Sequence, residues 1–312
     1  MFFNSQHLSK ISKETNFIQN NLEKVLRLSE ILKFLNTSDA FKDKLVLKGG
    51  TAINLTISLS RLSVDIDLDL VSATTKEDMT AIREELHDKL LQYMWSEEYS
   101  LLEQPRMHHA LTSYKFNYIN QAGNRDNIMI EINYMNRVHI LPLEYKDIQI
   151  PFLESNKILT LNAIELYASK INALISRATP RDLYDVYKMI ENKLIANNNM
   201  LKKCTIFYNA IGGEQNLDNI TFDNIKKINY NRIKRELKPV IAKTDKFDYI
   251  EATNKIIFYL ENLLNLTKKE IAFLENFRNK KYMPELLFDD IDIVNRIKNH
   301  PMAIWRTQKD KK

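Results

Sequence analysis

The segment from Leu62 to Leu70 alternates strictly between apolar and polar residues, and this alternation restricts the fold more than any other feature. The polar positions are Ser63, Asp65, Asp67 and Asp69. Because successive side chains of a strand point to opposite faces of a sheet, the segment predicts a strand with one buried face. Asp65 and Asp67 then lie side by side, about 6.5–7 Å apart along the strand. Neighbouring carboxylates repel unless a cation lies between them, so the pair indicates a metal site or simply a solvated sheet face. We expect Asp69 at the solvent-exposed end of the strand.

A second alternating segment, residues 127–135, carries another carboxylate. Together with residues 111–119 it predicts a hairpin around the turn at 121–126. Its isoleucines face one way, and Glu131 faces the other with Met129 and Asn133. If the two alternating strands pair with their apolar faces together, Glu131 joins the aspartate pair. Magnesium or manganese, which take oxygen ligands and share them with substrate phosphates, would then be bound by Asp65, Asp67 and Glu131.

A pair of glycines precedes the aspartate strand. Gly49 and Gly50 follow a short buried strand at 45–47, and Thr51 is a plausible N-cap for a helix that ends near residue 59. Glycine lets a backbone approach a phosphate closely, and a helix start offers N–H groups to an anion. We therefore predict that Gly49, Gly50 and Thr51 bind a triphosphate. Ser63, on the aspartate face of its strand, could donate to the same triphosphate.

The rest of the chain favours helices. Only 5 glycines and 7 prolines occur among 312 residues, too few for the many turns of an all-β protein. Apolar spacings of three and four predict helices at 7–37 and 77–95, and nearly all of the chain after Asn162 has helical periodicity. The expected fold class is α+β, with a mixed β-sheet lobe and flanking helices followed by a mostly helical C-terminal lobe. We place the two domains at residues 1–155 and 156–312.

The helical half contains two candidate phosphate-binding cations. Lys170 and Arg177 are seven residues apart, so they share a helix face and could both bind triphosphate oxygens. Thr179 and Pro180 then predict a helix start, with Thr179 as its cap. Asp182 in the first turn is either a partner of the helix dipole or part of the site.

Composition limits the kind of protein. A single cysteine excludes an intramolecular disulfide, and no apolar stretch approaches the roughly 18 residues of a membrane span, so we expect a soluble cytoplasmic protein. The net charge of +5 permits a polyanionic partner. Two basic clusters could bind RNA phosphates or could be solvated helix faces: residues 226–238, which include Tyr230, and residues 268–281.

Four segments resemble one known family. They are KGGTAINLTISLSRLSVDIDLDL at 48–70, EINYMNR at 131–137, ELYASKINALISRATPRDLYDVY at 165–187 and PELLFDDIDIVNRIKNHPMAIW at 284–305. Together they resemble the AbiEii/AbiGii (MenT-like) toxin family of the DNA-polymerase-β-type nucleotidyltransferase superfamily. The resemblance spans most of the chain, and the first and third segments are its most specific parts.

The resemblance implies a metal-dependent toxin that transfers a nucleoside monophosphate from a nucleoside triphosphate, in some members to the 3′ end of tRNA. It implies that Lys170 and Asp182 match positions needed for activity, beside Asp65 and Asp67. It also implies a cognate antitoxin as a partner. Two alternatives stay open: transfer to a protein or small molecule, and a non-catalytic module that only binds nucleotide or RNA.

Overall fold

The computed structural model describes residues 5–71, 75–150, 152–153, 156–212, 217 and 220–308. Contacts divide the chain into two compact units. The sheet unit comprises Met1–Arg137, Leu143–Leu161 and Pro239–Thr244, and the helical unit comprises Val138–Pro142, Asn162–Lys238 and Asp245–Lys312. Each unit therefore contains segments from distant parts of the chain, and the proposed domains at 1–155 and 156–312 stay a prediction.

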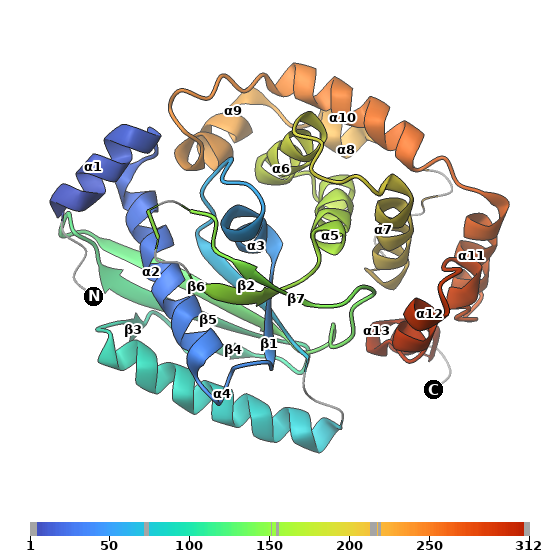
Figure 1. The fold of residues 1–312 in the computed structure, drawn as a ribbon, viewed down its shortest axis with the longest axis horizontal. Helices are drawn as coiled ribbons and strands as arrows, with labels where there is room; N and C mark the ends of the chain where they lie inside the picture. Colours follow the sequence, from blue (N-terminus) through green and yellow to red (C-terminus); the bar gives the residue numbers. More distant parts are fainter. Residues whose placement is uncertain are drawn as a thin grey trace. The chain divides into compact units, whose positions relative to one another are not determined.

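The sheet unit contains one mixed sheet of eight strands (Figure 1). The strands are β1 (Leu45–Lys48), β2 (Asp65–Leu70), β3 (Ser100–Leu101), β4 (Arg106–Met107), β5 (Leu111–Ile119), β6 (Arg125–Asn133), β7 (Glu144–Asp147) and β8 (Lys157–Thr160). Their order is β3-β5-β6-β2-β1-β8-β7, and β4 also pairs with β5. The β2–β6 and β1–β8 pairs are parallel, whereas the others are antiparallel. The predicted α+β fold class, with its mixed sheet and its hairpin at β5 and β6, is confirmed.

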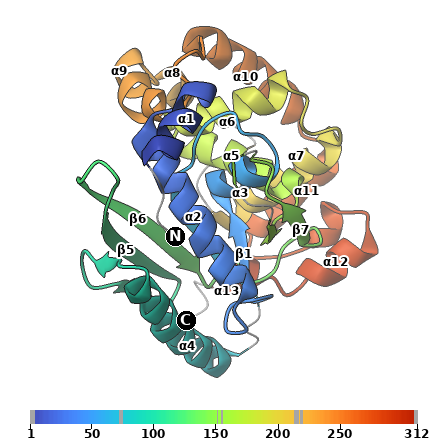
Figure 2. The ribbon, with the colours of Figure 1, turned by 60° about the vertical axis from the view of Figure 1, so that its left-hand side comes forward.

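Two helices cover the apolar face of this sheet, α2 (Gln19–Thr37) and α4 (Lys76–Ser96), as Figures 1 and 2 show. On β2 and β6 the alternating residues Ile66, Leu68, Ile130 and Ile132 are buried, as their spacing predicts. The helices contact each other through the stacked rings of Phe34 and Tyr93, and α4 contacts β5 where His87 Nδ1 lies 3.2 Å from the Tyr114 hydroxyl. These two helices therefore do not cover the polar face of β2, which carries the candidate site residues.

Two predictions about local structure are wrong. The segment 7–37 is not one helix but two, α1 (Ser5–Thr15) and α2. Asn16 lies between them with a φ of 59°, a left-handed conformation that asparagine tolerates and a helix interior excludes. No strand was predicted where β7 and β8 lie, because these four-residue strands are too short to show a period.

The helical unit contains the remaining helices. They are α5 (Ala163–Ser176), α6 (Pro180–Glu191), α7 (Asn198–Gly212), α8 (Asp223–Lys226), α9 (Tyr230–Arg232), the π-helix η2 (Ile233–Leu237), α10 (Tyr249–Leu263), α11 (Lys268–Arg278), the 3-10 helix η4 (Pro284–Leu286), α12 (Ile291–Ile297) and α13 (Pro301–Gln308). The exceptions are α3 (Gly49–Thr56), which belongs to the sheet unit, and the 3-10 helix η3 (Lys238–Val240), whose last two residues do. Phe207 on α7 contacts Tyr282, Phe288 and His300, so the C-terminal segments pack on α7. No helix in the described ranges has the length and apolarity needed to cross a membrane.

Candidate active site

The parallel pairing of β2 with β6 brings two of the predicted carboxylates together. Asp67 is the register partner of Glu131, and Asp65 is the partner of Met129. Residues in register on neighbouring strands point to the same face, and residues two apart on one strand do so too. Asp65, Asp67 and Glu131 therefore share one face of the sheet, where all three are half-buried.

The side chains as they stand do not form a finished metal site. Across the described ranges, no group of three or more His, Cys, Asp or Glu side chains is arranged to hold a metal ion. The chemistry of the donor set does fit magnesium or manganese, because carboxylate oxygens on one face are the hard ligands that these ions take. Gly49 adds to this fit, since it keeps a side chain out of the space beside Asp67.

Both glycines lie where a larger residue would collide with site residues. Gly49 has a φ of 70°, and a β-carbon there would overlap the Asp67 carboxylate. A β-carbon on Gly50 would overlap the guanidinium of Arg61 and lie 3.0 Å from Ser63 Oγ. The backbone of the glycine pair is thus in direct contact with the polar end of β2, which explains the adjacent glycines in a chain that has so few.

Thr51 is not the cap of the following helix, contrary to the prediction. The helix α3 (Gly49–Thr56) begins two residues earlier, and its N-cap Lys48 forms no side-chain capping bond. Thr51 is buried, and its hydroxyl is hydrogen-bonded to Ser63 Oγ at 2.9 Å and to the backbone oxygen of Asp65. Thr51 therefore fastens α3 to the start of β2 and fixes Ser63, while the start of α3 keeps N–H groups for an anion.

Asp69 is not at a solvated strand end, and that prediction is wrong as well. It is only 1% exposed, and its Oδ1 accepts a hydrogen bond from Lys48 Nζ at 2.5 Å. Burial raises the pKa of Asp69, and the neighbouring ammonium opposes that shift. Lys48 is also the register partner of Asp67, so a lysine lies beside the carboxylate row on the β1 side. β2 is a central strand flanked by β1 and β6, which is why its last aspartate is enclosed.

In the helical unit, the predicted residues form one charged cluster. Lys170 Nζ lies 2.9 Å from Asp182 Oδ1 and 3.1 Å from Asp185 Oδ2, and all three side chains are buried. Arg177 Nε donates to Asp182 Oδ2 at 2.9 Å, and Thr179 caps α6 as predicted. Asp185 lies three residues after Asp182, so both carboxylates are on one face of α6.

Asp182 is the centre of that cluster. Its carboxylate accepts bonds from Lys170, Arg177 and the Thr179 hydroxyl. Burial by itself would raise the pKa of Asp182, but Lys170 and Arg177 outweigh burial and hold the pKa well below its ordinary range. Asp182 is therefore ionised and keeps two cations in place, of which Arg177 has a 63% exposed side chain that can also meet a ligand.

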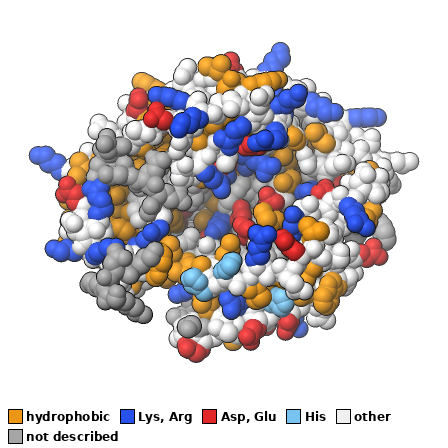
Figure 3. All heavy atoms as spheres, turned by 180° about the vertical axis from the view of Figure 1, so that it is seen from behind, with side chains coloured by type: hydrophobic (Ala, Val, Ile, Leu, Met, Phe, Trp, Pro, Cys, Tyr) orange, Lys and Arg blue, Asp and Glu red, His pale blue; other side chains and the backbone are white. Residues whose placement is uncertain are grey.

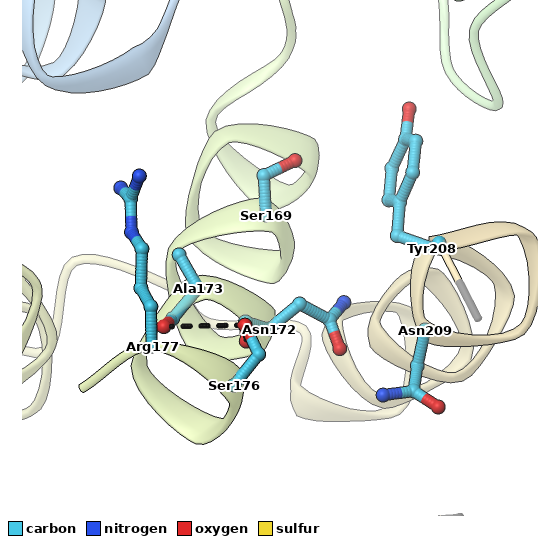
Figure 4. Close-up of a pocket in the computed structure, with 8 residues that line it drawn as sticks. Ser169, Asn172, Ala173, Ser176, Arg177, Tyr208 and Asn209 are labelled. Carbon is cyan, nitrogen blue, oxygen red and sulfur yellow. Dashed lines mark hydrogen bonds between the residues drawn. The ribbon is translucent and has the colours of Figure 1, made fainter. Parts of the chain in front are cut away.

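A small polar pocket opens beside Arg177, between α5 and α7 (Figure 4). Hydroxyls and amides line it, from Ser169, Asn172, Ser176, Tyr208 and Asn209. Its volume is about 260 Å³, below the usual range of sites for whole small-molecule ligands, which starts near 300 Å³. The pocket is therefore too small for a whole nucleoside triphosphate.

Glu165 on α5 is a buried carboxyl that the sequence analysis did not single out. It accepts hydrogen bonds from the backbone N–H groups of Ile140 and Leu141, both at 2.9 Å, and from the Tyr208 hydroxyl. Burial raises the pKa of Glu165 to about 7, although these donors and Arg296 work against the shift. Glu165 thus holds the segment Val138–Pro142 within the helical unit.

Comparisons with known proteins show what the chain is similar to. A family model described as the nucleotidyl transferase AbiEii toxin of type IV toxin–antitoxin systems matches residues 33–253. The fold is similar to that of MenT4, a nucleotidyltransferase toxin of Mycobacterium tuberculosis H37Rv, with a TM-score of 0.64 and 12% identity over 97% of this chain and 99% of that one. A putative nucleotidyltransferase of Helicobacter pylori matches with a TM-score of 0.47 and 16% identity over 84% of this chain and 96% of that one. No protein with a curated description matches the sequence.

Proposed function

The chain belongs to the AbiEii family of nucleotidyltransferase toxins of type IV toxin–antitoxin systems, and on that premise we propose that it modifies the 3′ end of tRNA. In the proposed reaction an acceptor hydroxyl attacks the α-phosphorus of a nucleoside triphosphate. The new oxygen–phosphorus bond forms as the bond to the β-phosphate oxygen breaks, so pyrophosphate leaves. The observation that carries the proposal is the in-register pair of Asp67 and Glu131 beside Gly49.

Asp65, Asp67 and Glu131 are the residues that would hold Mg²⁺ or Mn²⁺. When bound there, the metal would offset the charge of the triphosphate and help to ionise the attacking hydroxyl. The three carboxylates also set the charge of this sheet face, which in their ionised form repels an unneutralised triphosphate. Replacement of one carboxylate by an amide should therefore have a larger effect on the rate of transfer than on the stability of the fold.

The glycine turn and Ser63 have the proposed task of binding the triphosphate. Gly49 and Gly50 bring backbone close to the polar end of β2, and the N–H groups at the start of α3 can donate to phosphate oxygens. Ser63, fixed by its bond to Thr51, can add a hydroxyl donor. These N–H and hydroxyl groups would orient the phosphates. They would also bind the departing pyrophosphate without any rearrangement of the protein.

Lys170, Arg177 and Asp182 have a proposed task in the helical unit. The Lys170 ammonium has three N–H donors, two of which face Asp182 and Asp185, so one donor can bind a phosphate oxygen. Arg177 is exposed and can bind another. Asp182 would then be a positioning residue that fixes both cations, and its exchange should raise the KM for triphosphate.

Labelled transfer tests the proposal. The full-length protein is incubated with each α-³²P-labelled nucleoside triphosphate, total RNA and Mg²⁺ or Mn²⁺, and we expect label on tRNA-sized RNA. Asp67→Asn should reduce the rate at least 10²-fold. Asp39→Asn, which removes an exposed carboxylate after α2, is the matched control and should keep the rate.

The acceptor decides between the proposal and its alternatives. If protein or small molecules become labelled and RNA does not, the acceptor is a protein or small molecule and not tRNA. No transfer to any acceptor, with nucleotide still bound, would indicate a binding module instead of an enzyme. Family membership also implies a cognate antitoxin. Because nucleoside triphosphates and tRNA are cytoplasmic, the proposed reaction implies a cytoplasmic protein.

A further inference from the structure

One segment of the helical unit, residues 226–238, is rich in cations, and we call it the basic segment. It contains six cations: Lys226, Lys227, Arg232, Lys234, Arg235 and Lys238. Glu236 is its single carboxylate, so the segment has an excess of five positive charges, equal to the net charge of the entire chain. The charges of the remaining residues sum to zero, although the second basic cluster at 268–281 has five cations and two carboxylates.

Most of this charge is available to a ligand. Glu236 binds Arg232 at 3.1 Å and Arg235 at 2.7 Å. The four lysines are exposed, and their ammonium groups have no ion pair or hydrogen bond within the described part of the chain. Figure 3 shows one face of the molecule, on which lysine and arginine side chains gather in the upper part.

An aromatic side chain lies among these lysines. Tyr230 begins α9 and is 58% exposed. Lys234 and Lys238 follow it at intervals of four, through the π-helix η2, whereas Ile233 and Leu237 of the same turn are buried. Residues four apart share a helix face, so Tyr230, Lys234 and Lys238 form one exposed row. Such a row offers cations for phosphates and a ring on which an unpaired base can stack.

The basic segment is fastened to the turn that carries the Asp182 cluster. Arg232 Nη1 donates to the Ala178 carbonyl at 3.0 Å, and Arg181 Nε donates to the Glu236 carbonyl at 3.0 Å. Asn224 Nδ2, just before the segment, donates to the Ser176 carbonyl at 3.3 Å. The exposed Arg177 belongs to this same turn, so the cations of the segment continue the charged surface of the cluster.

We propose that the basic segment binds the phosphate backbone of the acceptor RNA close to its 3′ end, with Tyr230 stacked on an unpaired base. This inference rests on the proposed function and adds where the acceptor binds. A protein partner is a poorer match, because protein–protein interfaces are depleted in lysine and four of the six cations here are exposed lysines. A single-stranded RNA end supplies both phosphates and exposed base faces, which match the lysines and the tyrosine.

RNA binding, measured without nucleoside triphosphate or divalent metal, tests the surface apart from the chemistry. The probe is a fluorescein-labelled tRNA transcript, and the readout is anisotropy over a range of salt concentrations. Exchange of Lys226, Lys227, Lys234 and Lys238 for glutamine should weaken binding at least tenfold and lower the salt slope by about 3. Tyr230→Ser should weaken binding several-fold, whereas Tyr230→Phe, which keeps the ring, should not.

The second basic cluster supplies a matched control. Exchange of Lys268, Lys269, Lys280 and Lys281 for glutamine removes the same charge from the same unit, and we expect less than a twofold effect on RNA binding. An equal loss of RNA affinity from both sets of lysine exchanges would indicate general electrostatic attraction and would overturn the proposal. If the four exchanges in the basic segment leave RNA binding unchanged while the wild-type protein transfers label to tRNA, the proposed RNA-binding surface would be wrong and the proposed function would stand. A wild-type protein that labels another acceptor and does not bind tRNA would overturn both.

Discussion

Gly49 lies against the carboxylate of Asp67 so closely that any β-carbon at position 49 would overlap that carboxylate. The two residues come from neighbouring elements, the start of α3 and the centre of β2, and the β1–β2 pairing fixes them beside each other. The glycine keeps open the side of Asp67 at which we expect a metal and a phosphate to meet. The first prediction follows from this contact.

Gly49→Ala should reduce nucleotide transfer at least tenfold and destabilise the protein by about 1–2 kcal/mol. The first effect comes from displacement of the Asp67 carboxylate, and the second from the positive φ at this position. Gly123→Ala is the matched control, because Gly123 has a φ of 77° but no neighbour within 4 Å of an added β-carbon. It should share the loss of stability, measured by urea unfolding, and keep the activity. Equal activities in the two variants would contradict the prediction.

Lys48→Met should lower the free energy of unfolding by about 3–5 kcal/mol. It removes the ammonium that binds the buried carboxylate of Asp69, and removal of one partner of a buried ion pair is costly. The double variant Lys48→Met/Asp69→Leu removes both charges and should recover much of the loss. Chemical denaturation of the three proteins measures this coupling. A double variant less stable than Lys48→Met would show that the ion pair is not the cause.

The acid limb of the stability curve should depend on Asp182. Its pKa is lower in the folded protein than in the unfolded chain, so its contribution is fully present above about pH 4. That contribution is lost as the pH falls from the unfolded pKa toward the folded one. Asp182→Asn should be less stable at pH 7, because it breaks the cluster, yet should lose less additional stability between pH 5 and 3. Urea unfolding at each pH tests this, with Asp39→Asn expected to keep the wild-type acid limb.

Glu165 should act in the opposite direction near neutral pH. Its folded pKa of about 7 lies above the unfolded value, so the folded state holds the proton more tightly. The stability it provides is therefore present at pH 4 and falls as the pH rises toward 7, by about 3 kcal/mol. Glu165→Gln should remove this decline, although it loses an acceptor for Ile140 or Leu141. Thermal unfolding between pH 4.5 and 8 measures the slope, and the exposed control Glu84→Gln should retain it.

Much of the catalytic strand could be predicted from local pattern. The alternation at 62–70 defines which side chains of β2 are buried, and the same reasoning on β6 puts Glu131 on the polar face. The cap and proline of α6 were predicted because Thr179 and Pro180 act within their own turn. Asn16 was missed because a single left-handed residue in an otherwise helical pattern has no period of its own.

The sequence by itself determined the faces of β2 and β6, the start of α6 and the residue types that can bind metal and phosphate. These follow from side-chain spacing, which acts over a few residues. Only the tertiary structure decided that Asp69 is enclosed with Lys48, that Thr51 fastens α3 to β2, and that Lys170 lies between Asp182 and Asp185. Those outcomes depend on which strand or helix packs beside another, and the charge a carboxylate keeps depends on the neighbours and burial that such packing gives it.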